Sequence, residues 1–243
     1  MYTGCLEKLK AVFNGMRRAA AAVAVFAAAS QSGWAHAVTG SDADFLKSVS
    51  GTHIGPFLYL GAKHMVTGYD HLLFLFGVIF FLYRLRDVAI YVTCFAAGHS
   101  ITLLFGVLSG VHVNPYLVDA LIGLSVVYKA FDNLDGFRTL FGWQPNAKAA
   151  VFGFGLIHGF GLATKLQDFA LSSKGLIVNI ISFNVGVEIG QLLALGVILS
   201  FIVSYRRTSG FIRHAVLANV LLMTAGFVLV GYQLAGYVLG PAA

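Results

Sequence analysis

Residues 61–81 read GAKHMVTGYDHLLFLFGVIFF, and this stretch decides the kind of fold. Three ionisable side chains, His64, Asp70 and His71, stand at the head of a run that is otherwise apolar. Ionisable groups inside a lipid bilayer are costly, so they are rare there and usually mark a functional site. The stretch therefore predicts a membrane-embedded helix that begins beside a polar site.

The composition of the whole chain agrees with a membrane protein. Of its 243 residues 58% are hydrophobic and only 11% are charged, against roughly 25% charged in a soluble domain. A helix needs about 20 mostly apolar residues to cross the hydrocarbon layer. We therefore predict an all-α, polytopic integral membrane protein without a soluble domain. Its six transmembrane helices are expected near residues 56–83, 88–109, 114–131, 148–166, 175–204 and 211–238.

The first 37 residues resemble an export signal. Four lysines and arginines precede an apolar run, residues 19–29, and the triplet Ala35-His36-Ala37 follows. This order is typical of a secretory signal peptide, with cleavage after the small-residue triplet. We predict a signal peptide over 1–37 and a six-helix domain over 38–243. An uncleaved amino-terminal anchor is the alternative.

The charges in the loops predict how the chain is oriented. Lysine and arginine collect in loops on the cytoplasmic side. Signal cleavage would leave Val38 outside, and the loops that then face the cytoplasm hold most of the remaining positive charges. We predict the bacterial inner membrane as the location, with both mature ends periplasmic. Much of the net charge of +6 belongs to the signal, so it does not indicate nucleic-acid binding.

Four ionisable residues are predicted to lie at a similar depth in the membrane. His71, His99, His158 and Glu188 each lie within a few residues of the centre of a different predicted span. Groups at one level on four helices could meet in the interior of one bundle. Imidazole and carboxylate together suit zinc, nickel, iron, copper or cobalt better than calcium or magnesium. The pattern predicts a metal site, and a proton relay built from the same residue types is the alternative.

The first span poses a geometric question. On an unbroken helix His64 and His71 would share a face but lie about 10 Å apart along the axis, too far for one ion with bonds of about 2.1 Å. Either the helix is interrupted near Thr67-Gly68, or His64 is a separate outer station. We predict the second arrangement. Asp70 could be a ligand itself, or could orient an imidazole on another helix.

Other polar residues are candidates for secondary roles. Asn184, Glu188 and Gln191 are spaced i, i+4 and i+7, which predicts one polar stripe on a helix. The stripe could line the site or form a seam of hydrogen bonds between helices. Ser100 follows His99 directly, and Asp119 lies shallower in the third span, where it could face the outer aqueous side.

At these residues the chain resembles the HupE/UreJ family of bacterial membrane proteins. The matching pieces lie in residues 55–200: His64-x5-Asp70-His71, then FAAGHSITL, LIHGFGLA and FNVGVEIGQ. The resemblance implies a nickel, or nickel and cobalt, permease whose metal-associated motif is His64, Asp70 and His71. Met65 stands where the hydrogenase-linked branch often has proline, so the chain looks closer to the broader UreJ-like branch.

Three functions are compatible with these observations. The leading one is a secondary transporter of a transition metal, nickel or cobalt by resemblance. Because the sequence has no nucleotide-binding loop, transport would use an ion gradient or a partner. The alternatives are an intramembrane metal-dependent hydrolase and a non-catalytic, metal-binding accessory subunit of a larger membrane complex. A membrane-protein partner or a second copy of the chain is compatible with each.

Overall fold

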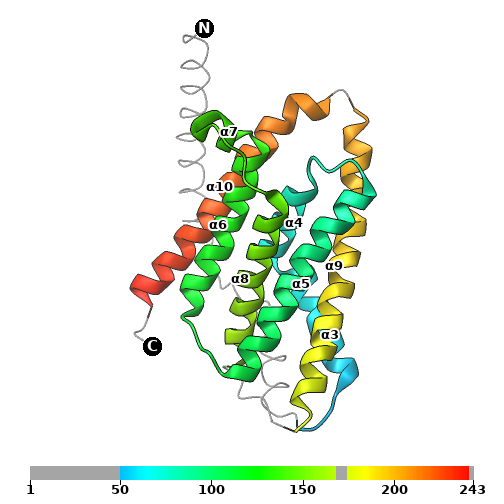
Figure 1. The fold of residues 1–243 in the computed structure, drawn as a ribbon, viewed down its shortest axis with the longest axis vertical. Coiled ribbons are helices and arrows are strands. Elements are labelled where there is room, and N and C mark those ends of the chain that lie inside the picture. Colours follow the sequence, from blue (N-terminus) through cyan, green and yellow to red (C-terminus); the bar gives the residue numbers. More distant parts are fainter. Residues whose placement is uncertain (1–49, 168–173, 209, 241–243) are drawn as a thin grey trace.

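The computed structural model describes residues 50–167, 174–208 and 210–240. The predicted signal peptide and its cleavage site lie outside the described residues. Every regular element in the described part is helical, as predicted. Figure 1 shows the helices α3 (Ile54–Thr67), α4 (Tyr69–Ile79), α5 (Leu85–Ser109), α6 (Pro115–Asn133), α7 (Gly136–Phe141), α8 (Ala147–Gln167), α9 (Leu176–Arg206) and α10 (Gly210–Leu239).

The described helices correspond in order to the six predicted spans. Only some of them are both long enough and apolar enough to be recognised as membrane-spanning. Four helices, α5, α8, α9 and α10, are long and apolar enough to cross a bilayer. The protein is therefore a membrane protein, and crossing by α6 and by the α3–α4 pair stays a prediction. The short helix α7 lies between the third and fourth predicted spans, in a segment for which no helix was predicted.

The first predicted span is broken at Gly68. Its backbone is extended there, with φ −73° and ψ 104°, so α3 ends at Thr67 and α4 begins at Tyr69. Gly68 N–H donates to the carbonyl of His64 at 2.9 Å, and its own carbonyl accepts from the N–H of Leu72 at 3.0 Å. These two bonds keep the regular helical pattern on either side of Gly68, and the N–H of His71, in the first turn of α4, donates to the side chain of Asp70 at 2.9 Å.

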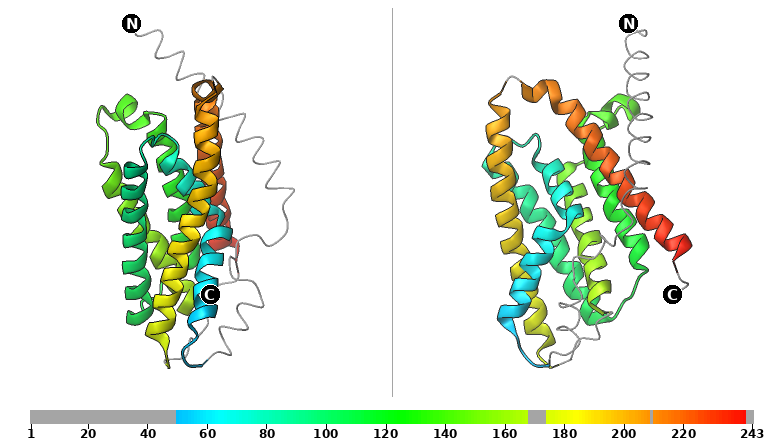
Figure 2. Two further views of the ribbon diagram at one scale, coloured as in Figure 1. Left: turned by 90° about the vertical axis from the view of Figure 1, so that its right-hand side faces the viewer. Right: turned by 180° about the vertical axis from the view of Figure 1, so that it is seen from behind.

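The long helices pack as three pairs around α4. Helix α5 lies along α8, α3 along α9, and α6 along α10, while α4 contacts α3, α5, α6, α9 and α10 and meets α8 through the ring of His158. Figure 2 shows α3 running alongside α9, with α4 continuing from it toward the middle of the bundle. Two of the pairs approach closely through glycine. A Cβ at Gly159 of α8 would lie 2.1 Å from the carbonyl oxygen of His99, and one at Gly186 of α9 would lie 2.0 Å from that of Leu58.

Helix α4 ends under a cation from another helix. The guanidinium of Arg206, the last residue of α9, donates to the carbonyls of Ile79 at 2.5 Å, Phe80 at 2.7 Å and Leu82 at 2.8 Å. Positive charge at a helix C-terminus satisfies carbonyls that have no partner within the helix. Arg206 therefore fixes the end of α4 that lies away from the break.

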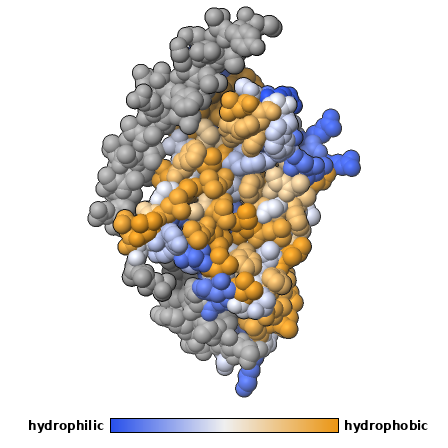
Figure 3. Space-filling view, turned by 60° about the vertical axis from the view of Figure 1, so that its left-hand side comes forward, coloured by the Kyte–Doolittle hydropathy of each residue, from blue (hydrophilic) through white to orange (hydrophobic). Residues whose placement is uncertain are grey.

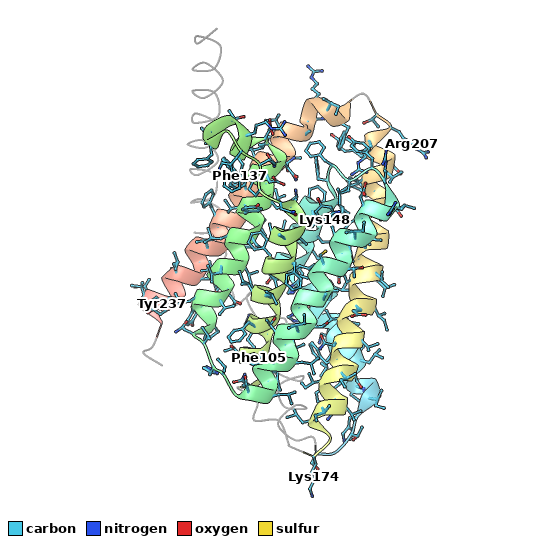
Figure 4. All side chains as sticks on the ribbon, viewed as in Figure 1. Phe105, Phe137, Lys148, Lys174, Arg207 and Tyr237 are labelled. Atoms are coloured by element: carbon cyan, nitrogen blue, oxygen red, sulfur yellow. The ribbon has the colours of Figure 1, made fainter. Side chains whose placement is uncertain are left out.

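The outer surface of the bundle is apolar. Large hydrophobic side chains are exposed along α9 and α10, for example Leu192, Val197 and Phe201 on α9. Figure 3 shows one face of the molecule, much of which is covered by hydrophobic residues. Charged residues mark the ends, with Arg207 at one end of the bundle and Lys174 at the other (Figure 4). A surface of this kind fits contact with lipid.

Candidate metal centre

Four histidines from four helices converge inside the bundle at the break between α3 and α4. His71 is central: its ring centroid lies 5.0 Å from that of His64, 4.9 Å from that of His158 and 6.1 Å from that of His99. All four side chains are buried, the most exposed being His64 at 8%. The prediction from depth that His71, His99 and His158 lie at one level is therefore matched by their positions.

The break in the first span changes the expected place of His64. On a regular helix it would lie about two turns from His71. Because the chain turns at Gly68, the last turn of α3 instead brings His64 against His71, with the two rings edge to face. The expectation of a separate outer station came from unbroken helical geometry, and the alternative, an interruption at Thr67-Gly68, is the one the structure has.

Asp70 holds the ring of His71. One carboxylate oxygen, Oδ1, accepts from the His71 backbone N–H at 2.9 Å and from its Nδ1 at 2.9 Å. An ionised carboxylate can only accept, so Nδ1 carries the proton and Nε2 is left with its lone pair. That Nε2 is buried and has no hydrogen-bond partner among the described residues. Asp70 thus orients the neighbouring imidazole in its own helix, whereas the sequence had left open direct ligation or the orientation of an imidazole on another helix.

Ser125 of α6 fixes His158 in a comparable way. Its hydroxyl donates to the carbonyl of Ile122 at 2.7 Å, so its oxygen is free to accept from His158 Nε2 at 3.2 Å. The proton therefore sits on Nε2, and Nδ1 presents a bare lone pair. Nδ1 is buried and has no partner among the described residues. A metal-binding histidine usually donates its other ring N–H to a hydrogen-bond partner, and that partner sets the tautomer in this way.

His64 and His99 complete a shell of unpaired nitrogens. Both ring nitrogens of each are buried without a hydrogen-bond partner in the described part of the chain. With His71 Nε2 and His158 Nδ1 this makes six such atoms on four neighbouring rings, and each neutral ring offers one lone pair. Leaving one buried polar atom unsatisfied costs about 1–3 kcal/mol, and a concentration of them in a native structure needs an explanation. A bound cation supplies one, because imidazole nitrogens are among the commonest metal ligands.

Three residues already have the spacing of a metal site. One ligand atom each from Asp70, His71 and His158 lie within 4.8 Å of one another. Two imidazoles and a carboxylate suit a divalent transition metal rather than calcium or magnesium. His64 and His99 stand beside this group and could add nitrogens. The residues predicted from sequence therefore fit a transition-metal ion, with the exception of Glu188.

Glu188 does not reach the histidines. Its side chain is exposed on α9, while Asn184 and Gln191 on the same helix are buried at 6% and 2% exposure. Glu188 follows Val187, a buried residue at 3% exposure, and one residue turns the helix by about 100°. The predicted stripe is thus split: the two amides point into the bundle, and the carboxylate points out of it.

The buried amides and Ser100 differ in what they contact. Both polar atoms of the Asn184 amide and Nε2 of Gln191 have no partner among the described residues. Gln191 lines a small apolar cavity together with His71, Met65 and Tyr91. Ser100 is half-buried, and no described contact links it to the site.

A second cavity opens on the other side of His71. It has an empty volume of about 210 Å³ and is lined by His64, Asp70, His71, Asp119, Ile122, His158, Leu162 and Lys165. It lies toward the end of the bundle where α6 begins and α8 ends. The apolar cavity, with an empty volume of about 250 Å³, lies toward the opposite end, where α5 and α8 begin. Of the described residues, His71 is the only one that lines both.

Two residues at this centre escaped prediction from sequence. Ser125 lies in an apolar run, LIGLSVVYK, where a serine is ordinarily a packing residue. Lys165 stands near the end of a predicted span, where a lysine normally reaches for the interface. Here it lines the cavity and donates to Asp119 at 3.0 and 2.8 Å. Neither residue carried a sequence signal that separated it from these ordinary roles.

Fold and site together define a class, the polytopic helical membrane protein with a cluster of histidines and one aspartate buried between its helices. The family model of the HupE / UreJ protein matches residues 40–240, so the chain belongs to that family. This confirms the resemblance drawn from the four motifs. Comparison with curated proteins gives no match, and neither does comparison with solved structures.

Proposed function

We propose that the protein carries a transition-metal ion, nickel or cobalt, across the bacterial inner membrane as a secondary transporter. The observation that carries this proposal is the cluster of four buried imidazoles centred on His71, six nitrogens of which have no hydrogen-bond partner among the described residues. Membership of a family that is linked to nickel and cobalt uptake supports the choice of metal. The ion is the substrate here, and the protein provides the ligands and the path.

Some residues of the cluster would bind the ion, and others orient those ligands. His71 Nε2 and His158 Nδ1 present lone pairs that Asp70 and Ser125 keep free of protons. They would bind the ion with an oxygen of Asp70, and His64 or His99 would add a further nitrogen. Loss of the hydration shell is costly for a cation, and these ligands replace it at the centre of the bundle.

The two cavities suggest how the ion moves. The cavity lined by Asp119 and Lys165 leads to the site from the end of the bundle that the loop charges assign to the periplasm. The cavity lined by Tyr91 and Gln191 continues toward the opposite end. Periplasmic mature ends and six crossings fit this direction of uptake. Because the chain has no nucleotide-binding loop, an ion gradient or a partner protein would drive it.

Metal uptake into proteoliposomes tests the proposal. The full chain is reconstituted, and accumulation of radioactive nickel and cobalt is compared for the unaltered protein and for His71→Ala and His64→Ala. Since His64 and His71 belong to one cluster, we expect both variants to lose uptake at limiting and at saturating metal alike. His214→Ala is the matched control, because that exposed histidine bonds Tyr205 far from the cluster.

Two results would count against this function. The unaltered protein could fail to accumulate any of nickel, cobalt, zinc, iron or copper, which would remove the basis for a transporter. Alternatively, His71→Ala could transport like the unaltered protein, and the cluster would then have no part in uptake. If His64→Ala lost uptake only at limiting metal, the result would support the hypothesis that His64 is a separate outer binding site.

A further inference from the structure

An ion pair stands in the cavity that leads to the metal centre. Lys165, in the last turn of α8, donates through Nζ to both carboxylate oxygens of Asp119 in the first turns of α6, at 3.0 and 2.8 Å. The two side chains are 30% and 12% exposed. They line one cavity with His64, Asp70, His71 and His158. The pair therefore lies beside the route that an ion would take to the cluster.

The charge of this ammonium bears on the metal site. Lys165 lines the same cavity as Asp70 and His64. A positive charge in a cavity opposes the arrival of a second one, and this repulsion is stronger away from bulk water. At the same time the ammonium neutralises Asp119, which would otherwise be an oxygen ligand on the path. Lys165 thus occupies the place that a cation would take at Asp119.

The chemistry of the two partners makes an exchange possible. Lysine carries its charge on a flexible four-carbon stem, so Nζ can leave Asp119 without movement of α8. A divalent ion gains more from a carboxylate than an ammonium does, because it has twice the charge. A monovalent ion gains no such advantage over the tethered ammonium. Competition with Lys165 therefore favours divalent over monovalent cations.

We propose that Asp119 is an outer capture site for the divalent substrate and that Lys165 is a tethered cation which fills this site until the substrate displaces it. The inference rests on the proposed function and adds to it a second cation site and a determinant of selectivity. Asp119 hands the ion on to Asp70 and the histidines, and Lys165 returns to it when the ion has moved inward.

Equilibrium binding of nickel to the purified full chain tests the exchange. Lys165→Met keeps the stem and removes the competing charge, so the affinity for nickel should rise by at least about tenfold. Asp119→Asn removes the capture ligand and leaves the ammonium, so the affinity should fall by a similar factor. Excess sodium should compete for Lys165→Met and leave the unaltered protein little changed.

The opposite signs of the two effects separate exchange from a structural role. An ion pair that only holds α6 to α8 would be broken by either variant, and both would then weaken nickel binding and lower the unfolding temperature. Lys129→Met is the matched control, since Lys129 pairs with Asp132 on α6 outside this cavity. It should leave the affinity for nickel unchanged.

Each outcome has a distinct meaning. Unchanged or weaker binding by Lys165→Met, with the unaltered protein binding nickel, overturns the exchange and leaves the transporter standing. Absence of nickel binding by the unaltered protein overturns both. If Lys165→Met does not fold, Lys165→Gln provides the same comparison, because it also removes the charge while keeping a polar group toward Asp119.

Discussion

The hydroxyl of Ser125 shows how much of the centre depends on single atoms outside the set of ligands. By accepting from His158 Nε2 it determines which nitrogen of that ring is free. Without it, His158 could carry its proton on Nδ1, the atom that faces no partner in the described part of the chain. The tautomer of one imidazole, and with it one candidate ligand, is thus set by a residue on a different helix.

Replacing this hydroxyl should weaken metal binding while the fold is kept. For Ser125→Ala we expect a loss of about 10–100-fold in nickel affinity, the usual effect of removing a partner that orients a ligand. Equilibrium dialysis of the purified protein measures it. Ser182→Ala is the control, because that buried serine bonds the carbonyl of Val178 in its own helix and no other group in the described part of the chain. Equal affinities for the two variants would show that His158 needs no such orientation.

For single residues, the sequence predicted most members of the cluster but not the helix face on which each side chain lies. The four histidines and Asp70 were found because ionisable residues in apolar spans are rare. Depth along a helix, however, says nothing about the face on which a residue lies. Glu188 sits at the predicted depth and on the exposed face, since contact with α3 determines which side of α9 is buried. Ser125 and Lys165 are recognisable only through their partners.

At the scale of elements, the interruption at Gly68 creates the site. The conformation of Gly68, φ −73° and ψ 104°, is open to any residue, so space rather than backbone freedom requires glycine. A Cβ there would lie 2.8 Å from His71 Nδ1 and 3.0 Å from Asp70 Oδ1. The small residue and the hydrogen bond between Asp70 and His71 therefore depend on each other.

Gly68→Ala should break this hydrogen bond with little change in helix content. The methyl group displaces the carboxylate or the ring, and we expect nickel affinity to fall by at least about tenfold, as for other lost orienting partners. Gly153→Ala is the control, because a Cβ at Gly153 meets nothing within 4 Å although His158 lies on the same helix. Affinity and circular dichroism are measured together. Unaltered affinity in Gly68→Ala would mean that Asp70 need not hold His71.

The opposite end of α4 supports a prediction about stability. Arg206→Ala leaves the carbonyls of Ile79, Phe80 and Leu82 without their cation. Hydrogen bonds from a charged donor contribute roughly 1.5–3 kcal/mol, so the variant should unfold at a clearly lower temperature. Arg207→Ala, an exposed neighbour, should unfold like the unaltered protein. The same unfolding temperature for both variants would contradict a capping role for Arg206.

Helices could be predicted from the sequence only where a local pattern of apolar or turn residues marked them. Apolar runs and turn residues predicted the helices and their order. The break was predicted only as an alternative, because a glycine in a membrane helix is often a packing residue and nothing nearby in the sequence distinguishes the two roles. Helix α7 was missed, since GFRTLF follows turn residues and is too short for a periodic pattern.

For the whole molecule, the prediction that reaches beyond the described residues concerns its amino terminus. Cleavage after Ala37 would leave a mature chain that starts at Val38 on the periplasmic side. Mass spectrometry of the protein isolated from membranes should detect that start. Recovery of an amino-terminal peptide that includes Lys8 would favour the uncleaved anchor, and the assignment of sides from loop charges would need a new basis.

The position of His71 between two cavities has a consequence for the energy balance of the cell. Among the described residues that line the two cavities, this imidazole is the one that they share. An open pore would let protons and sodium run down their gradients, whereas a path that narrows to a single ring passes one ion for each rearrangement. Collective motions of this kind take microseconds to milliseconds. Under the proposed function, nickel would enter slowly and saturably, and the membrane would keep its voltage.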